Sequence, residues 1–183
     1  MAHLNIMLDD AEWKKIFIMP KIYIKNIRIR EFQHKITHRY YGCDSKVAKW
    51  DRTVPATCKL CKNGIANILH TFYECQVTQI FWENLEDWMN SNIFTQNQIK
   101  LTALSVIIGD PTHLKTGHML NHCLIYAKYF IHRQRQINKR PELRSFIPFY
   151  TIVLQTEKER YCMTGKLKQF SKIFGKISEK LSV

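Results

Sequence analysis

The sequence predicts a mainly α-helical protein, folded as a small and irregular helical domain. Apolar residues recur at helical spacing over most of the 183 residues. A hydrophobic content of 45% and an aromatic content of 12% are typical of a globular chain and exclude a disordered one. Cys58, Cys61, His70 and Cys75 lie close together at zinc-type spacing. The full prediction is therefore a mainly α domain that one Cys3His zinc knuckle staples together.

Residues 1–50 are expected to form an N-terminal basic helical segment. A short apolar and basic stretch at residues 13–17 is ended by Pro20, which has no amide hydrogen to continue a helix. Between residues 22 and 40, apolar side chains recur at roughly helical spacing with Lys and Arg between them. This pattern predicts one amphipathic and strongly basic helix, which Gly42 breaks.

Residues 51–92 are expected to form the zinc-binding segment. Its second part carries an aromatic stripe at helical intervals, which indicates a helix that packs against the core and ends at residues 90–92. The members of the stripe are Phe81, Trp82, Leu85, Trp88 and Met89.

Residues 93–160 are expected to be the C-terminal helical part of the same domain. Residues 101–108 are apolar and fit either a strand or a helix. Residues 113–138 predict a long helix with basic residues in its last turns, as the helix dipole favours, and Pro141 stops it. Residues 143–154 predict a further apolar helix.

Residues 161–183 are expected to be a basic tail. Its lysines stand four residues apart, with apolar side chains on roughly the other side. Gly175 weakens a helix here by about 1 kcal/mol relative to Ala. We expect a disordered tail, with a contact to nucleic acid or to an anionic membrane surface as the alternative. The lysines are Lys168, Lys172, Lys176 and Lys180.

The four zinc-type residues have a spacing that suits one tetrahedral site. Two residues separate Cys58 from Cys61, which places two thiolates on one side of a tight turn. His70 follows after eight residues and Cys75 after four more, and both complete the ligand set from a second short element. Three thiolates and one imidazole leave no open coordination position, so we expect one Zn²⁺ with a structural and not a catalytic role. The alternative is a set of unrelated reduced cysteines.

The sequence carries no targeting signal, so we expect an intracellular protein. The first 13 residues include acidic groups and no continuous apolar stretch, unlike a signal peptide. No apolar run approaches the length of a membrane span. In a reducing environment the remaining cysteines, Cys43, Cys123 and Cys162, are expected to be buried structural thiols.

The charge of the chain is strongly unbalanced. It carries 28 Lys and Arg against 15 Asp and Glu, which gives a formal net charge of +13 and a pI of about 9.6. Such an excess favours a polyanionic partner, either nucleic acid or an anionic membrane surface.

The basic helix over residues 22–40 supplies the first candidate nucleic-acid contacts, and the zinc segment and the last turns of the helix at 113–138 supply secondary ones. Their cations can track a phosphate backbone, although a solvated helix face is the alternative. Tyr40, Tyr41 and Tyr73 can stack on bases, but a core or hydrogen-bonded position is the expectation for each. The candidate phosphate contacts are Arg28, Arg30, Lys35, His38, Arg39, Lys59, Lys62, Arg133 and Arg135.

The sequence offers no convincing catalytic residue. His118 and His122 lie four residues apart, as in half of a metal site, but Met119 stands where a zinc protease needs a glutamate. Cys162 lacks a nearby arrangement of His and acid that would activate a thiol. We therefore expect a protein that is not an enzyme.

The residues around the metal ligands resemble a known family. His-Thr-Phe-Tyr-Glu-Cys at 70–75, followed by Phe81 and Trp82, is similar to the zinc-binding segment at the C-terminal end of reverse transcriptases from LINE-type (non-LTR) retrotransposons. The resemblance covers about residues 13–160. Its other matching stretches lie at 13–17, 30–33 and 38–39 upstream, and at 109–110, 120–122 and 127–131 downstream. The family usually has acidic residues shortly before the histidine, where this chain has Ile-Ala-Asn-Ile-Leu.

The resemblance implies a role in holding template RNA or target DNA during reverse transcription that is primed at the target site. In the family the polymerase and the endonuclease lie upstream, and this chain shows residues of neither, so a non-catalytic C-terminal piece is implied. A nuclear location follows from the resemblance and from the basic charge. The alternatives are a module that docks on a separately encoded polymerase or another protein, and an element relic without function in isolation.

Overall fold

The computed structural model describes residues 8–109 and 117–183. Across these residues the chain is helical, with no strand and one isolated antiparallel bridge between Thr57 and Ile65, so the prediction of a mainly α fold is confirmed. None of the described helices is both long enough and apolar enough to span a bilayer. In chain order the described helices are α1 (Asp10–Tyr23), α2 (Ile27–Thr37), α3 (Asp44–Val47), the π-helical turn η1 (His70–Glu74), α4 (Gln76–Asn92), α5 (Ala103–Ile108), α6 (Gly117–Gln136), α7 (Leu143–Met163) and α8 (Leu167–Leu181).

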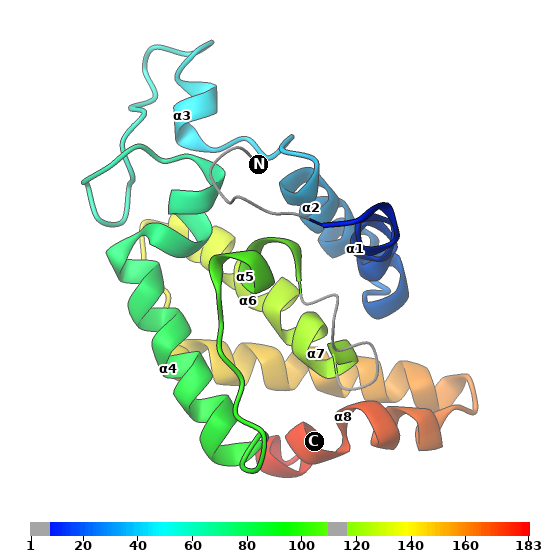
Figure 1. Ribbon diagram of the computed structural model, residues 1–183. Helices are drawn as coiled ribbons and strands as arrows, with labels where there is room; N and C mark the ends of the chain where they lie inside the picture. The colour runs from blue at the N-terminus through cyan, green and yellow to red at the C-terminus, as the bar shows by residue number, and fades with distance from the viewer. Residues whose placement is uncertain (1–7, 110–116) are drawn as a thin grey trace.

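Helix α6 forms the centre of the molecule (Figure 1). It contacts α1, α2, α5, α7 and α8, and every residue from 119 to 128 is buried. A helix that is enclosed on all sides places its polar side chains inside the core as well. These buried polar residues are Asn121, His122, Lys128 and Arg135. The helix predicted at residues 113–138 is confirmed from Gly117 to Gln136, while residues 113–116 lie outside the described part of the chain.

Helix α1 crosses Pro20, where the sequence predicts an end. It begins at Asp9, whose side chain accepts the amide of Glu12 while the Glu12 side chain accepts the amide of Asp9. Proline removes one helical hydrogen bond, but Met19, Pro20 and Tyr23 are all buried. Packing of this last turn therefore outweighs the lost bond.

Two helices stand where the sequence predicts one basic helix over residues 22–40. The backbone is extended at Ile24, and a new helix then starts at Asn26. The side-chain oxygen of Asn26 accepts hydrogen bonds from the amides of Arg28 and Ile29. These amides have no helical carbonyl before them, so the cap lets a new helix start at this point. The prediction of a single helix was wrong because apolar spacing does not record this cap. Helices α1 and α2 pack against each other and against α6.

Helix α4 confirms the predicted aromatic stripe. Four of its members are buried and Trp88 is half-buried. The indole Nε1 of Trp82 donates a hydrogen bond of 2.6 Å to the carbonyl oxygen of Phe72. This bond ties α4 to η1 and so fixes the position of Cys75, the residue between them.

Residues 101–108, which fit a strand or a helix by sequence, form the short helix α5 after two extended residues. Thr102 and Ser105 make a capping box, in which each side chain accepts the backbone amide of the other. The helix contacts α2, α6 and η1, so its apolar residues complete the core beside the cysteine segment.

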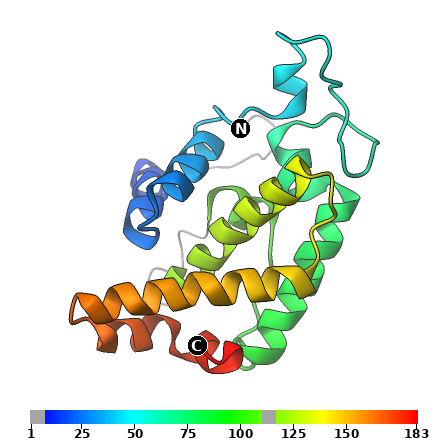
Figure 2. The same cartoon turned by 180° about the vertical axis from the view of Figure 1, so that it is seen from behind.

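The expectation of a disordered tail was wrong. Residues 167–181 form α8, which packs along α7, and α7 runs to Met163, beyond its predicted end (Figure 2). Gly165, with φ of +68°, makes the tight turn between the two helices. Phe170, Phe174 and Ile177 are buried, while the four stripe lysines are exposed. An amphipathic segment with a weak helix propensity becomes ordered when its apolar face packs against another helix. Its order therefore depends on tertiary packing and not on its own sequence alone.

Lys128 gives the fold a testable pH dependence. Its side chain is completely buried, and Nζ donates a hydrogen bond of 3.0 Å to the carbonyl oxygen of Ile107. Burial lowers the pKa of Lys128 from 10.5 to about 7, so above that pH the unfolded chain binds a proton that the folded chain does not. Stability therefore rises with pH between the two pKa values.

We expect the free energy of unfolding to rise by about 1 kcal/mol between about pH 7.5 and about pH 8.5, as measured by urea denaturation. The Lys128→Met variant keeps the length of the side chain without its charge, and stability should rise by about 1 kcal/mol less in it than in the unmodified protein over this pH range. An equal rise in both proteins would show that a different group is responsible.

Candidate metal centre

The structure brings all four predicted ligands together. One Sγ atom each from Cys58, Cys61 and Cys75 and a ring nitrogen of His70 lie within 4.8 Å of one another. The Sγ atoms of Cys58 and Cys75 are 3.8 Å apart, and Cys61 Sγ lies 3.4 Å from His70 Nε2. Cys58 and Cys75 are buried, while the other two are half-buried. This group could hold one metal ion.

The first two ligands sit on a tight knuckle. The carbonyl oxygen of Cys58 accepts the amide of Lys62, and the amide of Cys58 donates to the carbonyl of Gly64. These bonds, with the bridge between Thr57 and Ile65, fold residues 57–65 back on themselves. The amide of Asn63 points at Cys61 Sγ at 3.4 Å, so backbone donors face the sulfur as expected for such a turn.

The second pair of ligands comes from the turn η1 and the residue after it. The side-chain oxygen of Asn67 accepts the amide of His70 at 2.8 Å, and the amide of Cys75 donates to the carbonyl of His70 at 2.9 Å. Gly64 lies against the imidazole: a Cβ at this position would stand 3.0 Å from His70 Cε1, and its φ of +78° disfavours any other residue. Glycine therefore leaves room for the histidine ring at the cluster.

The prediction of Arg135 as a phosphate contact was wrong, because this side chain is buried against the candidate metal centre. Its Nη1 donates a hydrogen bond of 3.3 Å to Cys58 Sγ, and its Nη2 lies 3.0 Å from Asp44 Oδ2. The side chain is buried, so it faces the cysteine cluster from α6 and not the solvent. Lys59 Nζ lies 3.7 Å from the other oxygen of Asp44. A positive group thus stands beside sulfurs that become negative on binding a metal.

The surroundings favour an anionic sulfur at Cys58. The hydrogen bond with Cys75 lowers the pKa of the Cys58 thiol well below its usual range, against the opposing effect of burial. Backbone amides of Cys61 and Leu60 and the guanidinium of Arg135 act in the same direction. Thiolates are the form in which cysteine binds metals.

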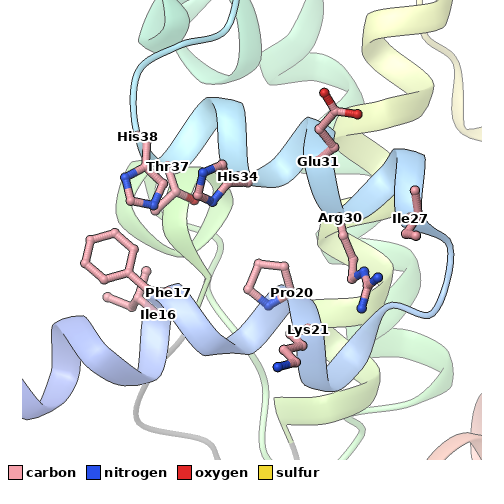
Figure 3. A pocket seen from close by; sticks show the side chains of 10 residues that line it. All are labelled: Ile16, Phe17, Pro20, Lys21, Ile27, Arg30, Glu31, His34, Thr37 and His38. Carbon is pink, nitrogen blue, oxygen red and sulfur yellow. The ribbon is translucent and has the colours of Figure 1, made fainter.

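The remaining candidate phosphate contacts are spread over the molecule: Lys59 and Lys62 lie next to the metal ligands on the knuckle, and the others lie on or just after α2 and on α6. Arg30 and His38 are half-buried and line a groove between α1 and α2, shown in Figure 3. Lys35 pairs with Glu31 at 2.7 Å. The exposed members are Arg28, Lys35, Arg39, Lys59, Lys62 and Arg133.

The predicted tyrosine positions are confirmed for two of the three residues. Tyr41 is half-buried and its hydroxyl lies 2.8 Å from His132 Nδ1, while the hydroxyl of Tyr73 donates to the carbonyl of Leu101 at 3.4 Å. Tyr40 is instead exposed at the end of α2. It therefore offers its ring to solvent.

The histidine pair on α6 lies inside the core. His122 is fully buried, with Nδ1 2.9 Å from the Tyr150 hydroxyl, and burial lowers its pKa to about 3. His118 packs against the rings of Tyr23 and Phe174.

The cysteines outside the cluster differ in exposure. Cys43 and Cys123 are buried, as predicted. Cys162 is exposed near the end of α7, so the prediction of a buried thiol was wrong there. It lies in the last turn of α7, and helical periodicity alone does not reveal that this position is exposed.

No family model matches this chain, and neither does a curated protein or a solved structure.

Proposed function

We propose that this chain is a non-catalytic nucleic-acid-binding module whose basic surface is held in shape by one structural zinc ion. The module resembles, by the residues around its metal ligands, the C-terminal end of a LINE-type retrotransposon reverse transcriptase without the polymerase and endonuclease. Template RNA or target DNA is its partner, and the nucleus is its site of action.

The distances in the cluster support zinc. In a tetrahedral site with zinc–sulfur bonds of about 2.3 Å and zinc–nitrogen bonds of about 2.0 Å, two sulfurs lie about 3.8 Å apart and a sulfur and a nitrogen about 3.5 Å apart. The distances in the chain are 3.8 Å for Cys58 to Cys75 and 3.4 Å for Cys61 to His70. These two distances match a tetrahedral zinc site, and a donor set of three sulfurs and one nitrogen suits zinc and leaves no position for a substrate.

The nucleic-acid proposal depends on the concentration of positive charge in the N-terminal third of the chain. Residues 9–62 hold 13 of the 28 Lys and Arg but only 6 of the 15 Asp and Glu. They form α1 with its N-cap, α2, α3 and the knuckle, which occupy the upper part of Figure 1, away from α8. Three of the six acidic groups lie together at the start of α1, and Glu31 and Asp44 are already paired with Lys35 and Arg135. A surface of this kind attracts a phosphate backbone.

Zinc contributes to binding through the fold. The knuckle carries Lys59 and Lys62 on its exposed side, and its buried side is fixed to α6 by Arg135. Because a structural site forms only in the folded chain, the free energy of metal binding is also folding free energy. The bound ion holds the knuckle in place through four bonds, and the lysines and arginines provide the affinity for nucleic acid.

Removing single exposed cations tests the proposal. We expect Lys62→Gln and Arg133→Gln each to weaken binding of a short RNA or DNA and to reduce the slope of log affinity against log salt by about 1. Fluorescence anisotropy over about 50 to about 200 mM salt measures both quantities. Lys172→Gln, an exposed lysine on α8, is the matched control and should leave the slope unchanged. Equal effects from all three variants would mean that no defined surface binds the strand.

A docking module is the second candidate, because α1 and α2 also expose large apolar side chains. Ile18, Ile22 and Ile27 are each about half exposed or more. A separately encoded polymerase would be the partner. A complex that survives nuclease treatment and is lost in Ile18→Asp/Ile22→Asp would favour this function over the first.

A further inference from the structure

Trp50 is the most exposed of the four tryptophans. It is 74% exposed at the end of the turn that follows α3, whereas Trp82 is buried and Trp13 and Trp88 are half-buried. Tryptophan is highly buried on average, because its large apolar surface stabilises a fold when it is removed from water. The indole of Trp50 contributes little of this kind to the fold, so its surface is available to a ligand.

The indole of Trp50 is also free of partners. It makes no ring contact, cation–π contact or hydrogen bond with any residue that the structure describes. A planar side chain that is mostly exposed cannot have both of its faces covered. Tyr40, another exposed ring, differs in this respect, since Lys46 Nζ lies 5.8 Å from its centroid and the ring of His38 lies 6.5 Å away. Trp50 therefore presents an uncovered aromatic face to solvent.

Two cations flank this ring. Lys49 precedes Trp50 and Arg52 follows it by two residues, and both are exposed and form no ion pair with a described residue. Consecutive Cα atoms are about 3.8 Å apart, so the backbone of both cations lies within about 8 Å of that of Trp50. Asp51 lies between them, but its Oδ1 already accepts hydrogen bonds from the amide and the hydroxyl of Thr53. The free ring face thus has a net positive charge beside it.

The segment that carries Trp50 is fixed to the metal knuckle. The amide and the hydroxyl of Ser45 both donate to the carbonyl oxygen of Ala66, at 3.3 and 3.0 Å, and so tie α3 to the end of the knuckle. The amides of Trp50 and Asp51 each donate to the carbonyl oxygen of Val47 at 2.9 Å, which closes the turn after α3. A backbone that is already ordered has little conformational freedom to lose when a ligand binds, which favours affinity.

We propose that Trp50 stacks on an unpaired base of a single-stranded nucleic acid, with Lys49 and Arg52 at the phosphates on either side of that base. The inference rests on the proposed function and adds the kind of strand and the place where it lies. Stacking on an aromatic side chain needs a free base face, and within a duplex the neighbouring base pairs cover both faces. An acidic peptide would satisfy the two cations but leave the indole without a partner. An apolar protein surface would cover the indole but leave the cations unused.

Three labelled probes of equal length separate stacking from charge in a fluorescence-anisotropy assay: an oligothymidine strand, the same strand with abasic sites, and a DNA duplex. We expect the protein to bind oligothymidine at least about 5-fold more tightly than the abasic strand. Trp50→Leu should weaken oligothymidine binding about 5- to 100-fold and change duplex binding less than about twofold. Trp50→Phe keeps an aromatic face and should lose less affinity than Trp50→Leu. Lys49→Gln should weaken binding of both single strands together.

Intrinsic tryptophan fluorescence gives a second readout, because stacking on a base quenches the emission of an exposed indole. Oligothymidine should quench the unmodified protein, and Trp50→Leu should abolish this quenching. The other three tryptophans are at least half-buried and should respond little.

Ile152→Ala is the matched control, because Ile152 is an exposed apolar residue on α7, which lies away from α3 in Figure 1. It should leave the binding of every probe unchanged, and circular dichroism and metal content verify the fold of each variant. Duplex and single strands bound alike, with neither quenching nor a loss of affinity in Trp50→Leu, would overturn the Trp50 site while leaving the proposed function intact. Failure of the unmodified protein to bind any probe would overturn both.

Discussion

Replacing Cys75 by Ser is expected to release the metal ion and to lower the free energy of unfolding by more than about 4 kcal/mol. Cys75 is fully buried and stands between η1 and α4, so its loss removes the metal bond that ties this junction to the knuckle. Structural zinc sites contribute about 10 kcal/mol or more of binding free energy, which a serine ligand does not retain. Metal analysis and thermal denaturation measure the two effects, and a strong chelator added to the unmodified protein should reproduce them.

The matched control is Cys162→Ser, which changes the same atom at an exposed position far from the cluster. This variant should keep one metal ion per chain and an unchanged melting temperature. A Cys75→Ser protein that retains both properties would contradict a stapling role for the cluster.

Replacing Arg135 by Gln is expected to cost about 3 kcal/mol of stability and to weaken metal retention. The guanidinium is buried and bonds both Cys58 Sγ, at 3.3 Å, and Asp44, at 3.0 Å. Its removal leaves the thiolate cluster without its nearest cation and Asp44 with only Lys59 at 3.7 Å. A loss of about 1 kcal/mol in the free energy of unfolding lowers the melting temperature of a chain of this size by about 2 to 4 °C. We therefore expect the melting temperature of Arg135→Gln to fall by roughly 6 to 12 °C.

Arg133→Gln is the control for this change. Arg133 lies two residues earlier on α6, is exposed, and is one of the proposed phosphate contacts. Arg133→Gln should weaken nucleic-acid binding and leave stability and metal content unchanged. Arg135→Gln should instead lower both stability and metal content. If the two variants behave alike, Arg135 has no special part in the metal centre.

Local patterns in the sequence were sufficient to group the four candidate metal ligands and to predict α4, α6 and the first part of α7. A tight turn can bring two side chains together only when few residues separate them. The short gaps between Cys58 and Cys61 and between His70 and Cys75 meet this condition, so their spacing predicts that each pair lies close together. The aromatic stripe of α4 repeats at the helical period and was predicted as core for the same reason.

Contacts between distant parts of the chain could not be predicted in this way. Arg135 is 77 residues from Cys58, and nothing in its neighbourhood distinguishes it from Arg133, since both are cations in the last turns of a helix. The break between α1 and α2 depends on one side chain, Asn26, that caps a new helix. Helix α8 is ordered because its apolar side packs against α7, and this contact cannot be predicted from the sequence of α8 alone.

The central claim is that zinc organises a basic surface that binds nucleic acid. The most direct test is fluorescence-anisotropy binding of short RNA and DNA over a series of salt concentrations, with the unmodified protein and the Cys58→Ser/Cys61→Ser variant. We expect binding that weakens steeply with salt in the unmodified protein and is lost, or reduced at least about tenfold, in the variant. A folded and metal-loaded protein that binds neither strand at low salt would contradict the account.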